Sequence, residues 1–477
     1  APVYPSPAGP STTAFRVMYR STLRGGGPVA ATGLVVLPKT EPATNSRTIA
    51  AWTHGTVGID ESCVETLDMT WMSPQFRAAL VQPALQRDLV LIAPDYFGMG
   101  AKVPGRDYAS YMVAEDQANA TLDMTRAVLS LGAVTKAANS VAVVGHSQGA
   151  QTAISTAERA SAYAPELNIE AAAGLATPGD LEEFVADSIE HAGTDEMFVA
   201  AAAFGMDMSY DGINPAEVLS TIPRNSSWES SYSVMRDVFN NSSSSANRYF
   251  LLTGKLPPKT PGDLFQIAAW QQADGIVYQN FAFSSPRGNR NLIGCSDEGI
   301  RRMAQYAIDI DKDGSMFKPV AEYTTSPTWT ALTNGVLAEN SAPTRPMTTP
   351  AFYAIGTCDG LIPLTKPVLP ECTKTPQPPI QPPVEEWSLQ PGYEWGRGLT
   401  TPVTSCLLGN NTSAKVYGEA DFNRDGLTDS GLEINGNGVP DVQRDHSTIL
   451  TNGATTDAWA FFDAALAGTW PEGCNRL

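Results

Sequence analysis

The chain has 477 residues, with 31 Lys plus Arg against 50 Asp plus Glu and a formal net charge of −19. This negative field repels phosphate backbones and anionic membrane surfaces, so we expect no nucleic acid as a partner. Hydrophobic residues make up 42% of the chain, so it can bury a large core, and the length suggests two to three domains or one enzyme domain with a large insertion.

Two observations bear on the compartment. The chain has no run of 18 apolar residues, so we expect no integral membrane segment, and its first residues, APVYPSPAGP, look like the mature end left by signal cleavage. Six cysteines without a CxxC pair fit disulfides in an oxidising compartment, although buried free thiols are the alternative. We expect Cys358 to pair with Cys372 and Cys406 with Cys474. Together these features predict a secreted, extracellular protein.

The first part of the chain alternates strands and helices. Residues 15–23 and 29–38 predict antiparallel strands joined by the turn RGGGP. Apolar runs of the buried-strand kind follow at 48–53, 89–94, 140–145 and 169–175. Helices are predicted between them at 111–131 and 148–162. The alternation predicts the α/β class, with a mainly parallel central sheet and helices on both faces.

The strand pattern stops from about 181 to 345 and then returns. Helices are predicted in this stretch at 194–206, 228–240, 262–272 and 297–308. Strands follow at 350–356 and 414–418, and a helix at 455–467 closes the chain. We therefore predict a core in two parts, 1–180 and 346–477, interrupted by a helical cap at 181–345.

Residues 145–149, GHSQG, form a GxSxG motif. The motif stands directly after an apolar strand and directly before an Ala-rich helix, which is the context that a nucleophile elbow requires. Its glycines leave room beside a serine in a sharp turn, and the helix N-terminus favours negative charge at the reacting centre. Ser147 is therefore the predicted nucleophile, the alternative being a glycine-rich turn with an idle serine.

A serine nucleophile needs a base, and the chain has four histidines. His146 adjoins the serine and is expected to face the wrong way, while His191 belongs to the helical insertion. His54 falls in THGTVG after an early strand, where we expect it and Gly55 to shape a loop of oxyanion donors. His446, between the last strand and the final helix, remains as the predicted base.

The predicted acid is Asp359, in a turn beyond the strand at 350–356. The order Ser147, Asp359, His446 is the order of the triad in α/β-hydrolases. Asp359 would hold the imidazole in the right tautomer, and the backbone N–H groups of Gln148 and Thr56 would form the oxyanion hole. The alternatives are an ordinary turn aspartate at 359 and a loop histidine at 446.

Five segments of the chain are similar to those of a known family. They are WTHGTVG (52–58), APDYFGMG (93–100), YMVAEDQANATLDMTRA (111–127), GHSQG (145–149) and GTCDGLIP (356–363). Together they resemble the secretory lipase group of α/β-hydrolases, over about residues 15–180 and 345–470. The resemblance implies an α/β-hydrolase fold with a helical cap inserted before the triad acid. It also implies carboxylic ester hydrolysis through an acyl-enzyme.

Residues 419–446, EADFNRDGLTDSGLEINGNGVPDVQRDH, contain a tandem acidic repeat. Oxygen-bearing side chains at alternating positions, followed by glycine at the sixth, suit a calcium loop, and the spacing resembles thrombospondin type 3 and dockerin-like loops. The candidate ligands are Asp421, Asn423, Asp425, Leu427, Asp429, Glu433, Asn435, Asn437, Asp441 and Asp445. Since Asp445 adjoins His446, we predict that structural Ca²⁺ orders the loop of the catalytic base, the alternative being a solvated polar loop. No organic cofactor is expected.

The sequence thus predicts a secreted serine carboxylic-ester hydrolase, a lipase or esterase whose substrate is an ester or a polyester. The Met-rich stretch 197–210 would line an apolar cleft over Ser147, or else pack the core of the cap. The alternatives are a serine peptidase on the same fold and a calcium-dependent binding protein with an inactive hydrolase core. The sequence leaves the acyl chain length and the oligomeric state open.

Overall fold

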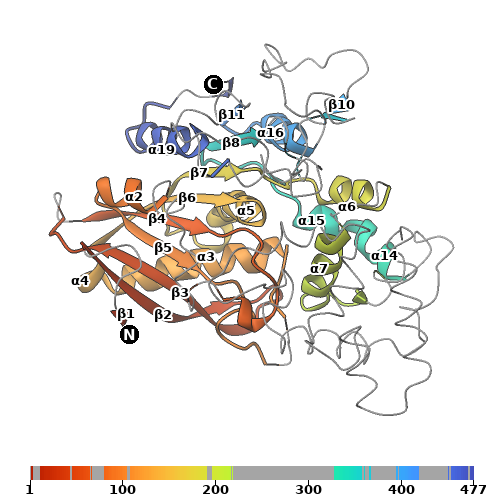
Figure 1. Cartoon of the computed structure of the whole chain (residues 1–477), viewed down its shortest axis with the longest axis horizontal. Coiled ribbons are helices and arrows are strands. Elements are labelled where there is room, and N and C mark those ends of the chain that lie inside the picture. Colours follow the sequence, from red (N-terminus) through yellow and green to blue (C-terminus); the bar gives the residue numbers. More distant parts are fainter. Residues whose placement is uncertain are drawn as a thin grey trace, which may run out of the picture.

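A single large sheet organises the described part of the chain (Figure 1). The computed structural model describes residues 2–3, 11–42, 46–64, 66, 80–104, 108–190, 196–215, 218, 327–356, 359, 362, 365–366, 394–395, 397–417, 449–450, 453–470 and 473–476. Within these ranges ten strands pair in the order β1-β2-β3-β5-β4-β6-β7-β8-β11-β12. Their bounds are β1 Pro2–Val3, β2 Thr12–Thr22, β3 Pro28–Pro38, β4 Arg47–Thr53, β5 Val90–Pro94, β6 Ala137–His146, β7 Ile169–Leu175, β8 Ala351–Gly356, β11 Thr412–Tyr417 and β12 Cys474–Arg476.

The N-terminal edge of the sheet is antiparallel. β2 pairs with β3 along its whole length, from Thr12 opposite Pro38 to Thr22 opposite Pro28, and β3 is antiparallel to β5. Gly25 and Gly26, in the turn between β2 and β3, both have positive φ, which glycine adopts without steric cost. The hairpin predicted for residues 15–38 is confirmed, and its first strand begins a few residues earlier than predicted.

From β5 to β12 every neighbouring pair is parallel. Strands of this kind end at the same edge of the sheet, so the segments that follow β4, β6, β7 and β8 are brought together although they lie far apart in sequence. The four apolar runs predicted as buried strands are β4, β5, β6 and β7. The predicted mainly parallel sheet is therefore confirmed.

Helices cover both faces of the sheet because its strands are apolar on both faces. On β4, Ile49 and Ala51 belong to one core cluster, whereas Ala50 and Trp52 belong to another. The first cluster is completed by α3 (Ala114–Ser130) and α5 (Gln148–Tyr163), and the second by α2 (Gln82–Gln86) and α19 (Gly453–Leu466). This alternation places the sheet at the centre of a three-layer core.

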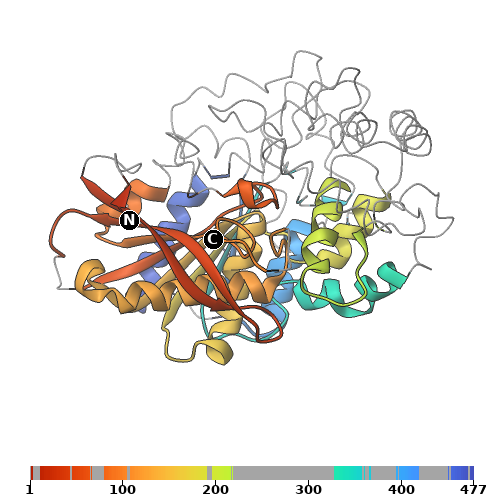
Figure 2. The same cartoon turned by 90° about the horizontal axis from the view of Figure 1, so that it is seen from below.

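Helical segments stand between β7 and β8, as the sequence predicts. They are α6 (Leu181–Glu190), α7 (Glu196–Asp207), α14 (Pro327–Ala331), the π-helical turn η7 (Leu332–Val336) and α15 (Leu337–Asn340). They gather beside the sheet at one end of the molecule (Figure 2). The helix predicted at 194–206 is α7, while those predicted at 228–240, 262–272 and 297–308 lie outside the described residues. No helix in the described ranges is long and apolar enough to cross a membrane.

The remaining short elements are η1 (Glu61–Cys63), α4 (Gly132–Thr135), the paired strands β9 (Thr365–Lys366) and β10 (Glu394–Trp395), and α16 (Arg397–Leu407).

The C-terminal part of the sheet is cross-linked. Cys406, in α16, forms a disulfide with Cys474, in β12. This pairing confirms the predicted bond. Cys63 is also disulfide-bonded. The predicted pair of Cys358 and Cys372 lies outside the described residues.

Candidate active site

Ser147 occupies the sharp turn between β6 and α5. Its backbone has φ 55° and ψ −124°, a conformation that costs a non-glycine residue on the order of 1–3 kcal/mol. The turn is held by the Ser147 N–H, which donates to the Leu175 carbonyl oxygen at 2.9 Å, and by the Ser147 carbonyl oxygen, which accepts from the Ala150 N–H at 2.8 Å. Strain of this kind, stabilised by its surroundings, is what a nucleophile elbow requires.

The two glycines of the GHSQG motif let the elbow pack against the end of β4. A Cβ atom on Gly145 would collide with the Gly149 carbonyl group and the Thr53 hydroxyl, and one on Gly149 would lie 2.5 Å from the His54 carbonyl oxygen. The Thr53 hydroxyl donates to the Gly149 carbonyl oxygen at 2.7 Å and so joins the two segments. Glycine is therefore needed at both positions because the elbow packs closely against the end of β4 and the loop that follows it.

That loop carries His54, Gly55 and Thr56. His54 is buried, its Nδ1 lies 2.8 Å from the Gly55 carbonyl oxygen, and its own carbonyl oxygen accepts a 2.8 Å hydrogen bond from the Tyr96 hydroxyl. Burial lowers the pKa of His54 to about 4, so its imidazole is neutral at pH 7. His146 Nδ1 lies only 3.1 Å from where a Cβ atom of Gly55 would stand. His146 thus lies against this loop, a contact that the sequence did not predict.

Tyr111 is a site residue that sequence reasoning missed. Its hydroxyl lies 2.7 Å from the Thr56 hydroxyl, and burial raises its pKa. Tyr111 also lines the same pocket as Ser147. It thereby ties the loop of predicted oxyanion donors to the pocket wall. Its position at the start of the family-like segment 111–127 was the available signal.

An apolar pocket opens at Ser147. Its empty volume is about 480 Å³, including space open to solvent. The walls come from the elbow, the segments before α3 and before α6, the helices α6 and α7, the start of α15 and the turn after β8. The lining residues are Tyr111, Met112, Ser147, Gln148, Pro178, Leu181, Phe184, Val185, Phe198, Val199, Ala202, Met206, Leu337 and Ile362.

Helix α7 serves both purposes that the sequence left open for the stretch 197–210. Phe198 and Ala202 line the pocket and are partly buried, whereas Ala201 and Phe204 pack into the apolar core among the inserted helices. Met206 and Val199 do both. One face of the helix therefore forms a pocket wall while the other stabilises it.

Asp359 follows β8 at the same edge of the sheet as Ser147. The carboxyl group is buried, and its Oδ1 accepts from the Ile362 N–H at 2.8 Å. Ile362 in turn lines the pocket at Ser147. The role of Asp359 as the triad acid, rather than as an ordinary turn aspartate, remains a prediction.

His446 and all ten candidate calcium ligands from Asp421 to Asp445 lie outside the described residues, as does His191. Within the described ranges, no group of three or more His, Cys, Asp or Glu side chains is placed to hold a metal ion. The base and the calcium site therefore remain predictions.

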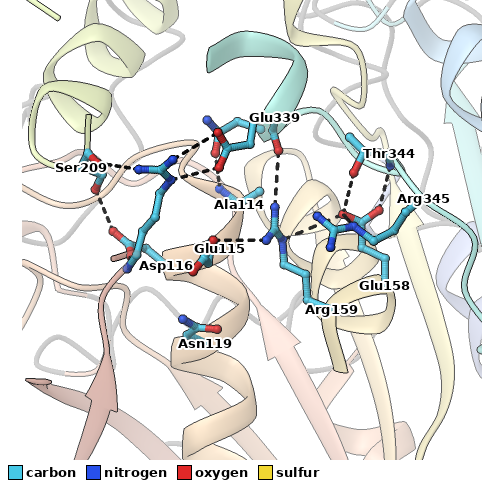
Figure 3. Close-up of polar contacts among 12 residues, drawn as sticks. Ala114, Glu115, Asp116, Asn119, Glu158, Arg159, Ser209, Glu339, Thr344 and Arg345 are labelled. Carbon is cyan, nitrogen blue, oxygen red and sulfur yellow. Dashed lines mark hydrogen bonds and ion pairs between the residues drawn. The ribbon is translucent and has the colours of Figure 1, made fainter. Parts of the chain in front are cut away.

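A polar network ties the inserted helices to the core (Figure 3). The Arg24 guanidinium, from the turn after β2, bonds both carboxylate oxygens of Glu339 in α15 at 3.0 and 3.2 Å and stacks on the ring of Tyr210. Asn340 is fully buried. Its Oδ1 accepts from the Ala114 N–H at the start of α3, and its amide donates to the Tyr210 hydroxyl.

On the other side of α15, Arg159 of α5 lies between Glu115, 3.4 Å away, and the Glu339 carbonyl oxygen. The segment after α15 is held by Glu158, which accepts from the Thr344 N–H and hydroxyl. Because Leu337 lines the pocket two residues before Glu339, this network fixes one wall of the pocket relative to Ser147.

Comparison with known proteins agrees with this geometry. Residues 65–212, which include the elbow and α7, match the family model described as Secretory lipase. The comparison with curated proteins found no match.

Two solved structures, one of a lipase and one of an esterase, are similar to this chain. Lipase A from Candida antarctica in its closed state is 16% identical, with a TM-score of 0.52, and the alignment covers 97% of this chain and 79% of that one. The rice cell wall degrading esterase LipA from Xanthomonas oryzae is 17% identical, with a TM-score of 0.48 and coverage of 96% and 91%. The likeness to lipase A confirms the predicted α/β-hydrolase fold.

Proposed function

We propose that the protein is a secreted serine carboxylic-ester hydrolase, a lipase or esterase, with Ser147 as nucleophile. One observation carries the proposal. Ser147 stands in a strained turn at the carboxyl edge of the sheet and opens directly into an apolar pocket, within the segment 65–212 that matches the Secretory lipase family model.

In the proposed reaction the Ser147 hydroxyl attacks the ester carbonyl carbon while His446 takes its proton. His446 then gives that proton to the leaving alcohol, so that an acyl-enzyme remains, and water releases the acid by the same two steps. Asp359 orients the imidazole. The oxyanion is bound by the Gln148 N–H, which belongs to the first turn of α5 and lacks an intrahelical acceptor, and by the Thr56 N–H.

The pocket favours an acyl group over a peptide. Apart from Ser147, Gln148 and Tyr111, the described lining is aliphatic, aromatic or thioether, and it includes no charged side chain. A free amine or carboxylate would lose its hydration there without a partner. Neutral esters with an apolar acyl chain, including aliphatic polyesters, are therefore the proposed substrates.

The insertion between β7 and β8 is proposed to act as a cap over Ser147, with boundaries at 181 and 345. The support is that α6 and α7 supply seven of the residues that line the pocket: Leu181, Phe184, Val185, Phe198, Val199, Ala202 and Met206.

The test is hydrolysis of 4-nitrophenyl esters of increasing acyl length by the purified protein. Ser147→Ala should abolish turnover and labelling by a fluorophosphonate, and Asp359→Asn and His446→Ala should each lower kcat by at least about a thousandfold. Ser130→Ala, at an exposed serine whose hydroxyl bonds its own helix, is the matched control. Unchanged turnover in Ser147→Ala would refute the proposal.

Calcium in the repeat at 421–445 is proposed as a structural ion that orders the loop of His446. The support is the repeated oxygen pattern and the covalent neighbourhood of Asp445 and His446. EDTA should lower Tm and activity together, and calcium, but not magnesium, should restore both. The double variant Asp421→Asn, Asp425→Asn should no longer respond. Insensitivity of the wild-type protein to EDTA would leave the repeat a polar loop.

A further inference from the structure

Gln148 has a buried side-chain amide without a hydrogen-bond partner. Its side chain is about 1% exposed, and neither Nε2 nor Oε1 has a partner among the residues that the structure describes. Buried side-chain amides in native proteins are nearly always hydrogen-bonded, so this exception calls for a function.

Other buried glutamines nearby behave differently. Gln117 donates to the Ser110 carbonyl oxygen at 3.3 Å and accepts from the Thr152 hydroxyl at 2.8 Å. Gln151, one turn after the elbow, donates to the Asn340 carbonyl oxygen. These amides join one segment to another, whereas the Gln148 amide joins nothing that the structure describes.

Gln148 cannot easily move to find a partner. It is the first residue of α5, and its carbonyl oxygen accepts from the Thr152 hydroxyl at 3.1 Å. Its neighbour Gly149 is in close contact with Thr53 and His54. The backbone that carries the Gln148 side chain is thus held on both sides, beside the nucleophile.

The pocket that Gln148 lines contains few other polar groups. Among the described residues of its lining, only Ser147 and Tyr111 also carry one, and the Tyr111 hydroxyl is already bonded to Thr56. Gln148 therefore brings a neutral donor and acceptor to the wall of an apolar pocket. It complements a ligand group that is itself neutral and both donates and accepts, and an alcohol hydroxyl is the simplest such group.

We propose that Gln148 selects esters whose acyl chain carries a hydroxyl group on carbon 2 or carbon 3, counted from the ester carbonyl carbon. The position follows from connectivity, because residue 148 adjoins the nucleophile that bonds the carbonyl carbon. A plain alkanoyl chain leaves the buried amide unpaired, and sites built to hydrogen-bond a substrate hydroxyl discriminate strongly against analogues that lack it. The inference rests on the proposed ester hydrolase function.

The first test uses the wild-type protein and three methyl esters, octanoate, 2-hydroxyoctanoate and 3-hydroxyoctanoate, with acid release followed in a pH-stat. At least one hydroxy ester should have a kcat/KM about tenfold or more above that of octanoate. A plain ester that is hydrolysed as well as or better than both hydroxy esters overturns the inference.

The second test removes the amide. In Gln148→Leu and Gln148→Met the ratio of hydroxy to plain kcat/KM should fall to about one. Met206→Leu, which changes an apolar wall of the same pocket, should keep the wild-type ratio. A ratio that persists in both Gln148 variants means that the amide is held by water, and the inference is wrong.

The two possible failures are distinguishable. If hydrolysis depends on Ser147 but the ratio of kcat/KM for hydroxy and plain esters is unchanged in the Gln148 variants, only the selectivity inference is wrong. If no ester is hydrolysed, or if Ser147→Ala retains the activity, the proposed function itself is wrong.

Discussion

Gly149→Ala is the substitution that tests the geometry of the elbow most directly. The added methyl group would lie 2.5 Å from the His54 carbonyl oxygen, and carbons of this kind essentially never lie within 3.0 Å of another heavy atom. The obstructing atoms are the backbone carbonyl atoms of Thr53 and His54, so no side-chain rotation relieves the contact.

The Thr53 carbonyl oxygen would lie closer still, so the end of β4 and the loop after it must shift by more than about 0.5 Å, which is the tolerance of a catalytic constellation. Because the loop also carries the Thr56 N–H of the proposed oxyanion hole, kcat should fall on the order of a hundredfold. Overpacking should also destabilise the fold by about 1–3 kcal/mol. The assays are steady-state ester hydrolysis and urea unfolding, with circular dichroism to verify that the variant is folded.

Gly132→Ala is the matched control. No atom lies within 4 Å of the position of the new methyl group, and the residue starts helix α4. This variant should keep wild-type kcat and gain about 0.5 kcal/mol of stability. If Gly149→Ala also kept wild-type kcat, close contact between elbow and loop would not be what places the oxyanion donors.

Three further predictions concern stability. Burial lowers the pKa of His54 from its ordinary value of 6.5 to about 4. Between these values the unfolded chain binds more protons than the folded one, so the free energy of unfolding decreases as the pH falls from 7 to 4. In His54→Gln this decrease, measured by urea unfolding, should be smaller by about 3 kcal/mol. Replacing both Cys406 and Cys474 by Ser removes a disulfide between residues 68 positions apart and should lower the free energy of unfolding by about 3 kcal/mol. An unchanged Tm after reduction of the wild-type protein would contradict this. Asn340→Ala leaves the buried partners of this side chain without a hydrogen bond and should lower the free energy of unfolding by about 2–3 kcal/mol. Arg24→Met removes a partly exposed ion pair and should lower it by about 1 kcal/mol or less. Equal losses in denaturation would contradict this ranking.

Much of the core could be predicted from local pattern. The apolar runs that became β4, β5, β6 and β7 are buried on both faces, and such strands are apolar at every position rather than at alternate ones. The elbow could be predicted because a strand, GHSQG and a helix follow one another within a few residues. The bond between Cys406 and Cys474 was also predicted correctly.

Contacts made across the chain could not be predicted in this way. Three contacts join segments that are far apart in the sequence. They are the hydrogen bond between Tyr111 and Thr56, the contact of His146 with Gly55 and the hydrogen bond from the Asn340 amide to the Tyr210 hydroxyl. Periodicity records which face of an element is buried, but it does not record which distant element covers that face.

By itself, then, the sequence determined the strand and helix order, the strained serine and the identities of the candidate acid and base, because each depends on neighbours within a few residues. Only the tertiary structure decided which side chains surround Ser147 and that the Gln148 amide is buried there without a described partner. Burial and hydrogen bonding are properties of three-dimensional neighbours, and parallel strands that end at one edge bring together residues from β4, β6, β7 and β8.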